Sequence, residues 1–197
     1  MEKTYKILKL LIWVLAFAVV IAGASVLYNR LSSEVEVGGI ATTPAVVEDP
    51  TGETEPQPSA APDFTVYDRE GNAHQFSEFK GKPVILNFWA SWCGPCVSEM
   101  PEFQRFYEQY GEDIHFVLVN LTDGQQETVE TASGFITEQG YTFPVYFDTD
   151  IDAAMKYGVS AVPVSYFIDA DGYFVAWAQG ALTEDMLQQG VDMLLGE

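Results

Sequence analysis

The chain has 197 residues, of which 48% are hydrophobic, so it can bury the core of one domain of ordinary size. Its formal net charge of −20 argues against a nucleic-acid partner, because phosphate binding needs a basic surface. We interpret the acidic excess as a solubility feature of an exposed domain, with the steering of basic partners as the alternative.

The N-terminal segment, residues 1–31, is predicted to be a short basic start followed by a transmembrane helix that anchors the protein. Three lysines precede an uncharged apolar stretch over residues 10–28, which is long enough for one membrane crossing. The lysine bias places the N-terminus inside the cell and everything after the anchor outside. A cleaved signal peptide is the alternative, because residues 22–24, Ala-Gly-Ala, resemble a small-residue cleavage site. The remaining chain is extracytoplasmic in both cases, either membrane-bound or secreted.

Residues 32–62 are predicted to be a flexible linker. They contain five prolines among Thr, Glu, Gly and Ala, and no aromatic residue. Such a composition cannot bury enough apolar surface to fold, and it is typical of a semi-extended tether.

Globular patterning begins at residue 63 and continues to residue 197, which predicts one domain. Residues 64–67 and 73–75 flank the turn-forming sequence Asp-Arg-Glu-Gly-Asn and are predicted to form a β-hairpin. Residues 84–90 are a continuous apolar run, typical of a strand that is buried on both faces.

A helix is predicted from the Cys93 region to about Tyr110, ended by Gly111 and kinked at Pro101. Strands and helices alternate after it, and the chain ends in a hairpin followed by a helix capped by Thr183. The later elements are predicted at 114–120 (strand), 128–139 (helix), 145–148 (strand), 152–157 (helix), and 164–169 and 173–179 (strands). This order is typical of an α/β domain with a mixed sheet.

The sequence Trp92-Cys93-Gly94-Pro95-Cys96 holds both cysteines of the chain, between the predicted buried strand and the helix. No second cysteine pair exists to complete a zinc site, and a structural disulfide closing so short a loop would stabilise little. The first sulfur would lie at the positive end of the helix dipole, which favours the thiolate needed for exchange. The motif therefore indicates reversible redox chemistry.

Residues 88–96, Phe-Trp-Ala-Ser-Trp-Cys-Gly-Pro-Cys, together with Ala-Val-Pro at 161–163 before a strand, resemble the thioredoxin superfamily. The apolar N-terminal stretch, the sequence of residues 96–101 and the extra helix and strand at 128–148 resemble its membrane-anchored, extracytoplasmic TlpA/ResA-like branch. The resemblance implies a thioredoxin fold with a mixed central β-sheet, an N-terminal β-hairpin extension and an αβ insertion. It also implies a thiol–disulfide oxidoreductase whose redox group is the Cys93–Cys96 disulfide, with no metal and no other cofactor.

Each residue of the motif receives a predicted role. Cys93 is expected to be the exposed nucleophile, and Cys96 the shielded resolving thiol that attacks the mixed disulfide formed at Cys93. Gly94 and Pro95 are expected to tune the redox poise through the turn between the sulfurs. Trp92 is expected on the apolar rim that partners touch, with a pure packing role as the alternative.

Pro163 is a candidate for substrate binding. The resemblance implies a cis Val162–Pro163 bond packed against the cysteine loop. The backbone of Val162 would then be free to pair with an extended substrate segment. An ordinary proline at a strand entry is the alternative, and Val164 follows it where the family often has a polar residue.

Glu99 is the third catalytic candidate. It lies three residues after Cys96 and six after Cys93, on roughly the same side of the helix. In the resembled branch a glutamate at this place helps control cysteine protonation, so Glu99 could accept the proton of the resolving thiol. Thioredoxins usually carry a buried aspartate on the preceding strand, whereas Asn87 occupies that position here and cannot ionise. A solvated acid that only complements the helix dipole is the alternative.

We expect electrons to flow from a membrane thiol donor through Cys93 and Cys96 to disulfides in exported proteins. In the resembled branch these include apocytochromes c and oxidised redox partners. A reductive direction is expected because the Gly-Pro pair resembles thioredoxin. A disulfide-forming oxidant of the same fold, a peroxiredoxin-like peroxidase and a non-catalytic binding module are the alternatives. The peroxidase would place its cysteine after a Pro/Thr-rich turn, without a neighbouring CxxC.

Overall fold

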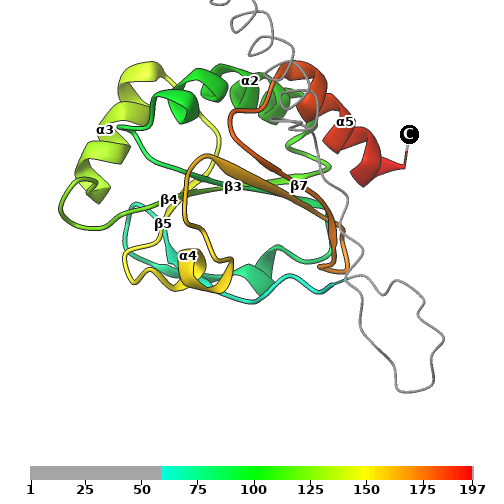
Figure 1. Ribbon diagram of the computed structural model, residues 1–197, viewed down its shortest axis with the longest axis horizontal. Helices are drawn as coiled ribbons and strands as arrows, with labels where there is room; N and C mark the ends of the chain where they lie inside the picture. The colour runs from blue at the N-terminus through cyan, green and yellow to red at the C-terminus, as the bar shows by residue number, and fades with distance from the viewer. Residues whose placement is uncertain (1–58, 197) are drawn as a thin grey trace, which may run out of the picture. The chain divides into compact units, whose positions relative to one another are not determined.

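A seven-stranded mixed sheet forms the centre of the computed structural model, which describes residues 59–196 (Figure 1). Its strand order is β2-β1-β5-β4-β3-β6-β7. The strands are β1 (Thr65–Tyr67), β2 (Ala73–Gln75), β3 (Val84–Trp89), β4 (His115–Asn120), β5 (Val145–Phe147), β6 (Val164–Ile168) and β7 (Phe174–Gln179). The helices are α2 (Gly94–Tyr110), α3 (Val129–Gln139), α4 (Asp152–Lys156), α5 (Glu184–Leu195) and the 3-10 helix η1 (Phe76–Phe79). The predicted order of strands and helices is confirmed, and η1 is an addition.

Strand β3 is the central element, and all six of its residues are buried. It runs parallel to β4 and antiparallel to β6, so the sheet is mixed as predicted. The apolar sequence of β3 fits this position, because a strand covered on both faces has no solvent side for polar residues. Its last residue, Trp89, lies four residues before Cys93, so the strand leads directly into the cysteine loop.

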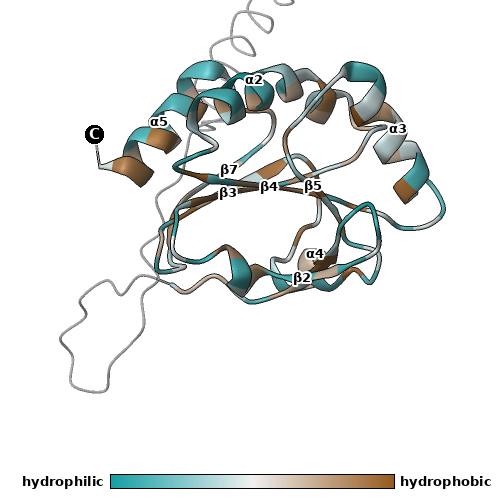
Figure 2. Ribbon diagram, turned by 180° about the vertical axis from the view of Figure 1, so that it is seen from behind, coloured by the Kyte–Doolittle hydropathy of each residue, from teal (hydrophilic) through white to brown (hydrophobic). Residues whose placement is uncertain are grey.

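Helices α2, α3 and α5 cover one face of the sheet, whereas α4 and η1 lie on the other (Figure 1). Each face buries its own apolar cluster: Phe103, Ile136 and Leu187 belong to the first, and Phe76 and Ala153 to the second. The hydropathy colouring shows the same arrangement, with hydrophobic central strands and hydrophilic outer helix surfaces (Figure 2). The two cysteines lie in the cluster beneath α2.

Local sequence signals explain where the helices begin and end. Thr128 caps α3 in a reciprocal capping box with Thr131, and Thr183 caps α5 by accepting the Met186 amide. Gly140 ends α3 with a φ of 73°, a left-handed conformation that glycine adopts at little cost. Pro101 lies inside α2, as predicted.

Residues N-terminal to the first strand already belong to the fold. The Ala61 amide donates to the Gly172 carbonyl, and the Phe174 amide donates to the Ser59 carbonyl. The folded part therefore includes the last residues of the segment predicted as a linker. The transmembrane helix predicted within residues 1–31 lies outside the described residues. Between residues 59 and 196, no helix combines the length and apolar character of a membrane span.

The contact between α5 and β6 yields a stability prediction. A Cβ atom added at Gly190 would overlap the Phe167 ring, whereas one added at Gly134 of α3 would meet no atom within 4 Å. We expect Gly190→Ala to lower the free energy of unfolding by about 1–3 kcal/mol through overpacking. Gly134→Ala should raise it by about 0.5–1 kcal/mol, because alanine favours the helix. Urea unfolding of both variants checks this, and a Gly190→Ala variant as stable as wild type would contradict the packing.

Candidate active site

The two cysteines form a disulfide across the first turn of α2. Cys93 is the N-cap of the helix, its Cα atom lies 5.2 Å from that of Cys96, and its sulfur accepts a hydrogen bond from the Cys96 amide at 3.2 Å. Cys96 is fully buried. The prediction of an exposed Cys93 is wrong for this oxidised form, because the residue is only 5% exposed. The Val162 carbonyl oxygen lies 3.6 Å from its sulfur and covers it.

The residues predicted for substrate binding and for redox tuning lie around this disulfide in two groups. Trp92, 51% exposed, Gly94 and Pro95 present an open surface around the buried Cys93. The second group is the turn before β6, where the Val162–Pro163 peptide bond is cis. Cys93 and Val162, which are 69 residues apart in the sequence, thus meet at the Cys93 sulfur.

Gln179, at the end of β7, holds the turn that carries Pro163. Its side-chain amide donates to the carbonyl oxygens of Ala161, at 3.2 Å, and Pro163, at 2.9 Å. The Gly180 amide also donates to the Pro163 carbonyl. Reasoning from the sequence missed Gln179, since no local pattern links the end of one strand to the turn before its neighbour.

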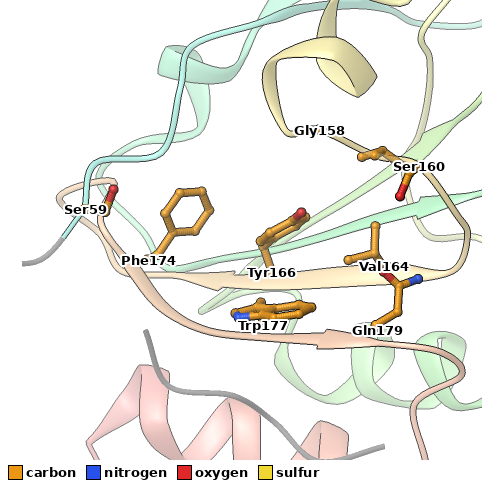
Figure 3. Close-up of a pocket in the computed structure, with 9 residues that line it drawn as sticks. Ser59, Gly158, Ser160, Val164, Tyr166, Phe174, Trp177 and Gln179 are labelled. Atoms are coloured by element: carbon orange, nitrogen blue, oxygen red, sulfur yellow. The ribbon is translucent and has the colours of Figure 1, made fainter. Parts of the chain in front are cut away.

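A cavity of about 430 Å³ lies beside this turn, on the face of β6 and β7 opposite α5 (Figure 3). Aromatic side chains of Tyr166, Phe174 and Trp177 line its middle. The other lining residues are Ser59, Gly158, Val159, Ser160, Val164 and Gln179. Because Gln179 contacts both the cavity and the cis-proline turn, the cavity adjoins the cysteine site without containing either sulfur.

Glu99 lies behind the disulfide, on the inner side of α2, and is only 1% exposed. One carboxylate oxygen accepts the Leu182 amide at 2.7 Å, and the other accepts the Asn87 side-chain amide at 2.9 Å. Burial raises the pKa of Glu99 to about 7, and the two hydrogen bonds oppose this by favouring the ionised form. The alternative of a solvated acid is therefore excluded, and Glu99 can take up or release a proton near neutral pH.

Asn87 connects Glu99 to the neighbouring strand. Its side-chain amide donates to the Ser165 hydroxyl at 2.9 Å as well as to Glu99. The sequence identified Asn87 as a replacement for an ionisable residue, but not Ser165. The alternation of side chains along β6 places Ser165 on the same face of the sheet as Phe167, beneath α2, and that pattern could have identified it.

No group of three or more His, Cys, Asp or Glu side chains that could hold a metal occurs within residues 59–196. The redox group of the site is the cysteine pair itself, which supplies and accepts electrons without a further cofactor.

Residues 58–176, which include both cysteines and Pro163, match the family described as the AhpC/TSA family. The thiol-disulfide oxidoreductase ResA of Geobacillus thermodenitrificans is 32% identical over 137 residues, which cover 69% of this chain and 76% of that protein. The ResA of Oceanobacillus iheyensis is 40% identical over 134 residues, which cover 66% and 68%. The crystal structure of StoA from Bacillus subtilis matches with a TM-score of 0.59 and 29% identity, over 68% of this chain and 99% of that one.

The raised pKa of Glu99 predicts a pH-dependent stability. The folded oxidised protein binds this proton more tightly than the unfolded chain, so the stabilisation is complete below the ordinary pKa of 4.5 and is lost as the pH rises through about 7. The difference between the pKa of about 7 in the folded protein and the ordinary pKa of 4.5 corresponds to about 3 kcal/mol of unfolding free energy. The free energy of unfolding of the wild type should therefore fall by roughly 3 kcal/mol more than that of Glu99→Gln between about pH 4.5 and pH 8. Urea unfolding across this range measures the difference, and parallel curves would contradict it.

Proposed function

Because the chain belongs to the AhpC/TSA family and is a thioredoxin-like thiol–disulfide oxidoreductase, we propose that it reduces disulfides in exported proteins through a Cys93–Cys96 dithiol cycle. The observation that carries the proposal is the disulfide at the start of α2, with Cys93 as the N-cap and Cys96 fully buried. The exposed residues Trp92, Gly94 and Pro95 lie next to Cys93, which supports Cys93 as the sulfur that meets the substrate once the disulfide is reduced.

The proposed cycle begins with the reduced enzyme. The Cys93 thiolate attacks one sulfur of a substrate disulfide, and the other substrate sulfur leaves as a thiolate. The Cys96 thiolate then attacks the Cys93 sulfur, closes the enzyme disulfide and releases the second substrate sulfur. Two electrons pass from the enzyme to the substrate, and two protons accompany them. A thiol donor at the membrane returns the enzyme to its dithiol form.

Glu99 acts as the base for Cys96 in this proposal. A buried thiol is a poor nucleophile until its proton is removed, because burial disfavours the thiolate. The carboxylate lies three residues further along the same helix and is also buried, and its pKa of about 7 matches proton uptake at neutral pH. Asn87 of β3 and the Leu182 amide before α5 hold both carboxylate oxygens, which fixes the orientation of the carboxylate beneath α2.

The rim supplies the contacts for the substrate. Trp92 offers an exposed aromatic surface next to Cys93, and Val162 offers a backbone against which an extended segment can pair. Pro163 is buried and has no backbone N–H, so it offers no donor that would compete with pairing at the Val162 backbone. Gly94 and Pro95, between the sulfurs, tune the redox poise by setting the geometry of the first helical turn.

We place the catalytic domain outside the cytoplasm, either anchored through residues 1–31 or secreted after cleavage. The basic start and apolar stretch of the sequence support this location, as does the similarity to proteins named ResA. The substrates proposed are apocytochrome c or oxidised redox partners among the exported proteins. The CxxC spacing disfavours a peroxidase, because a peroxidatic cysteine is expected after a Pro/Thr-rich turn and without a neighbouring CxxC.

Serine variants test the order of the two thiols. Cys93→Ser should abolish reduction of insulin disulfides, because the attacking sulfur is missing. Cys96→Ser should retain the first attack and accumulate mixed disulfides at Cys93, because the resolving thiol is missing. Turbidity of insulin and mass spectrometry of the adducts measure both outcomes. Equal alkylation rates of the two thiols in the reduced wild type, or turnover of hydrogen peroxide in place of insulin, would overturn the assignment.

The direction of electron flow has its own test. A reductant of the thioredoxin type should have a reduction potential of about −270 mV, whereas the potential of a strong disulfide-forming oxidant is about −120 mV. We expect a value below about −200 mV from equilibration with glutathione or dithiothreitol buffers. A clearly higher value would make the protein an oxidant of the same fold.

A further inference from the structure

A second buried carboxylate, Glu127, contacts the cysteine loop from the segment between β4 and α3. Its side chain is fully buried. One oxygen accepts the Ser91 backbone amide at 2.6 Å, and the other accepts the Ser91 hydroxyl at 3.0 Å and the Thr131 hydroxyl at 2.7 Å. A buried carboxylate is costly unless it is hydrogen-bonded, and here neutral donors satisfy both oxygens.

The segment that presents Glu127 is itself preorganised. The Asp123 carboxylate accepts the backbone amides of Gln125, Gln126 and Glu127 at 2.8–2.9 Å, and the Gly124 amide donates to the Glu127 carbonyl. Backbone hydrogen bonds to the carboxylate lower the pKa of Asp123, so the turn is held by an ionised group at neutral pH. The backbone that carries Glu127 is therefore held by hydrogen bonds that do not involve the cysteine loop.

The Ser91 amide is a point of attachment for the whole cysteine turn. The turn leaves β3 after Trp89, whose carbonyl accepts the Leu121 amide, and it closes with the Cys93 amide donating to the Ala90 carbonyl. Ser91 lies between these two points. Holding its amide fixes the direction in which the chain enters the N-cap of α2.

We propose that Glu127 is a positioning residue for thiol–disulfide exchange, which holds the Ser91 amide so that Cys93 is kept at the N-cap of α2. The proposal rests on Cys93 being the attacking thiol. It assigns a function to the αβ insertion, since Glu127 directly precedes the N-cap of α3. The carboxylate acts through its hydrogen bond and not through its charge, because a negative charge near Cys93 would oppose the thiolate.

Two substitutions separate the hydrogen bond from the charge. Glu127→Gln keeps the side-chain length and an oxygen acceptor but removes the charge. Glu127→Asp keeps the charge but is one methylene shorter, so the carboxylate no longer reaches the Ser91 amide. Thr131→Val is the matched control, because it removes a donor to the same carboxylate and weakens the α3 cap while leaving the Ser91 amide bound.

The measurement is the rate constant for attack of reduced enzyme on insulin, together with the pH midpoint of Cys93 alkylation. Glu127→Asp should lower the rate constant about tenfold and move the midpoint toward that of a free thiol, as expected for losing one hydrogen bond. Glu127→Gln should stay within about threefold of wild type. Thr131→Val should lower the thermal unfolding temperature and leave both kinetic readouts unchanged.

The opposite order, with Glu127→Asp close to wild type and Glu127→Gln impaired, would overturn the proposal in favour of a charge effect. Wild-type kinetics for both variants would show that Glu127 only stabilises the fold. Cys93→Ser is measured in parallel. If it is inactive, the proposed cycle holds and the outcomes above concern Glu127 alone; if it is active, the proposed cycle itself fails. Circular dichroism of each variant confirms that the folded protein is being compared.

Discussion

The hydrogen bond from the Cys96 amide to the Cys93 sulfur is the interaction on which the site depends. It exists because β3 ends at Trp89 and α2 begins at Gly94, which leaves Cys93 as the N-cap of the helix. The first amides of a helix lack partners within it, and an oxygen of Ser, Thr, Asp or Asn usually accepts them. A sulfur takes that place here. These free amides, together with the helix dipole, also favour a negative charge on the Cys93 sulfur.

Two buried carboxylates flank this junction and differ in how they are held. Glu99 comes from α2 itself and is bound by the Leu182 amide and Asn87. It therefore lies on the side of the helix that faces the sheet. Glu127 comes from the segment before α3 and is bound by Ser91, on the entry side of the turn. One acid is placed to exchange a proton, and the other to fix backbone geometry. Glu127 reaches Ser91 because β3 and β4 are adjacent parallel strands, so the segments that follow them start side by side.

Much of the fold was predictable because its signals are local. The apolar run of β3, the caps at Thr128 and Thr183, and the cysteine motif each depend on residues close together in the sequence. The resemblance to thioredoxins added the cis bond before Pro163, which composition alone does not reveal.

The contacts that complete the site join residues that are far apart in the sequence, so local patterns do not predict them. Glu99 meets the Leu182 amide across 83 residues, and Ser91 meets Glu127 across 36. Such pairs depend on the register of strands and the packing of α2, and neither partner carries a distinctive pattern. The shielding of Cys93 by the Val162 carbonyl was missed for the same reason.

The burial of Glu99 also affects what any bulk measurement on this protein reports. With a pKa of about 7 for Glu99, the oxidised protein in a neutral solution consists of two species, one with this side chain uncharged and one with it as an anion. Signals from Asn87, Ser165 and their neighbours are then averages over two electrostatic environments. A small change of pH near neutrality therefore changes the proportion of the two species.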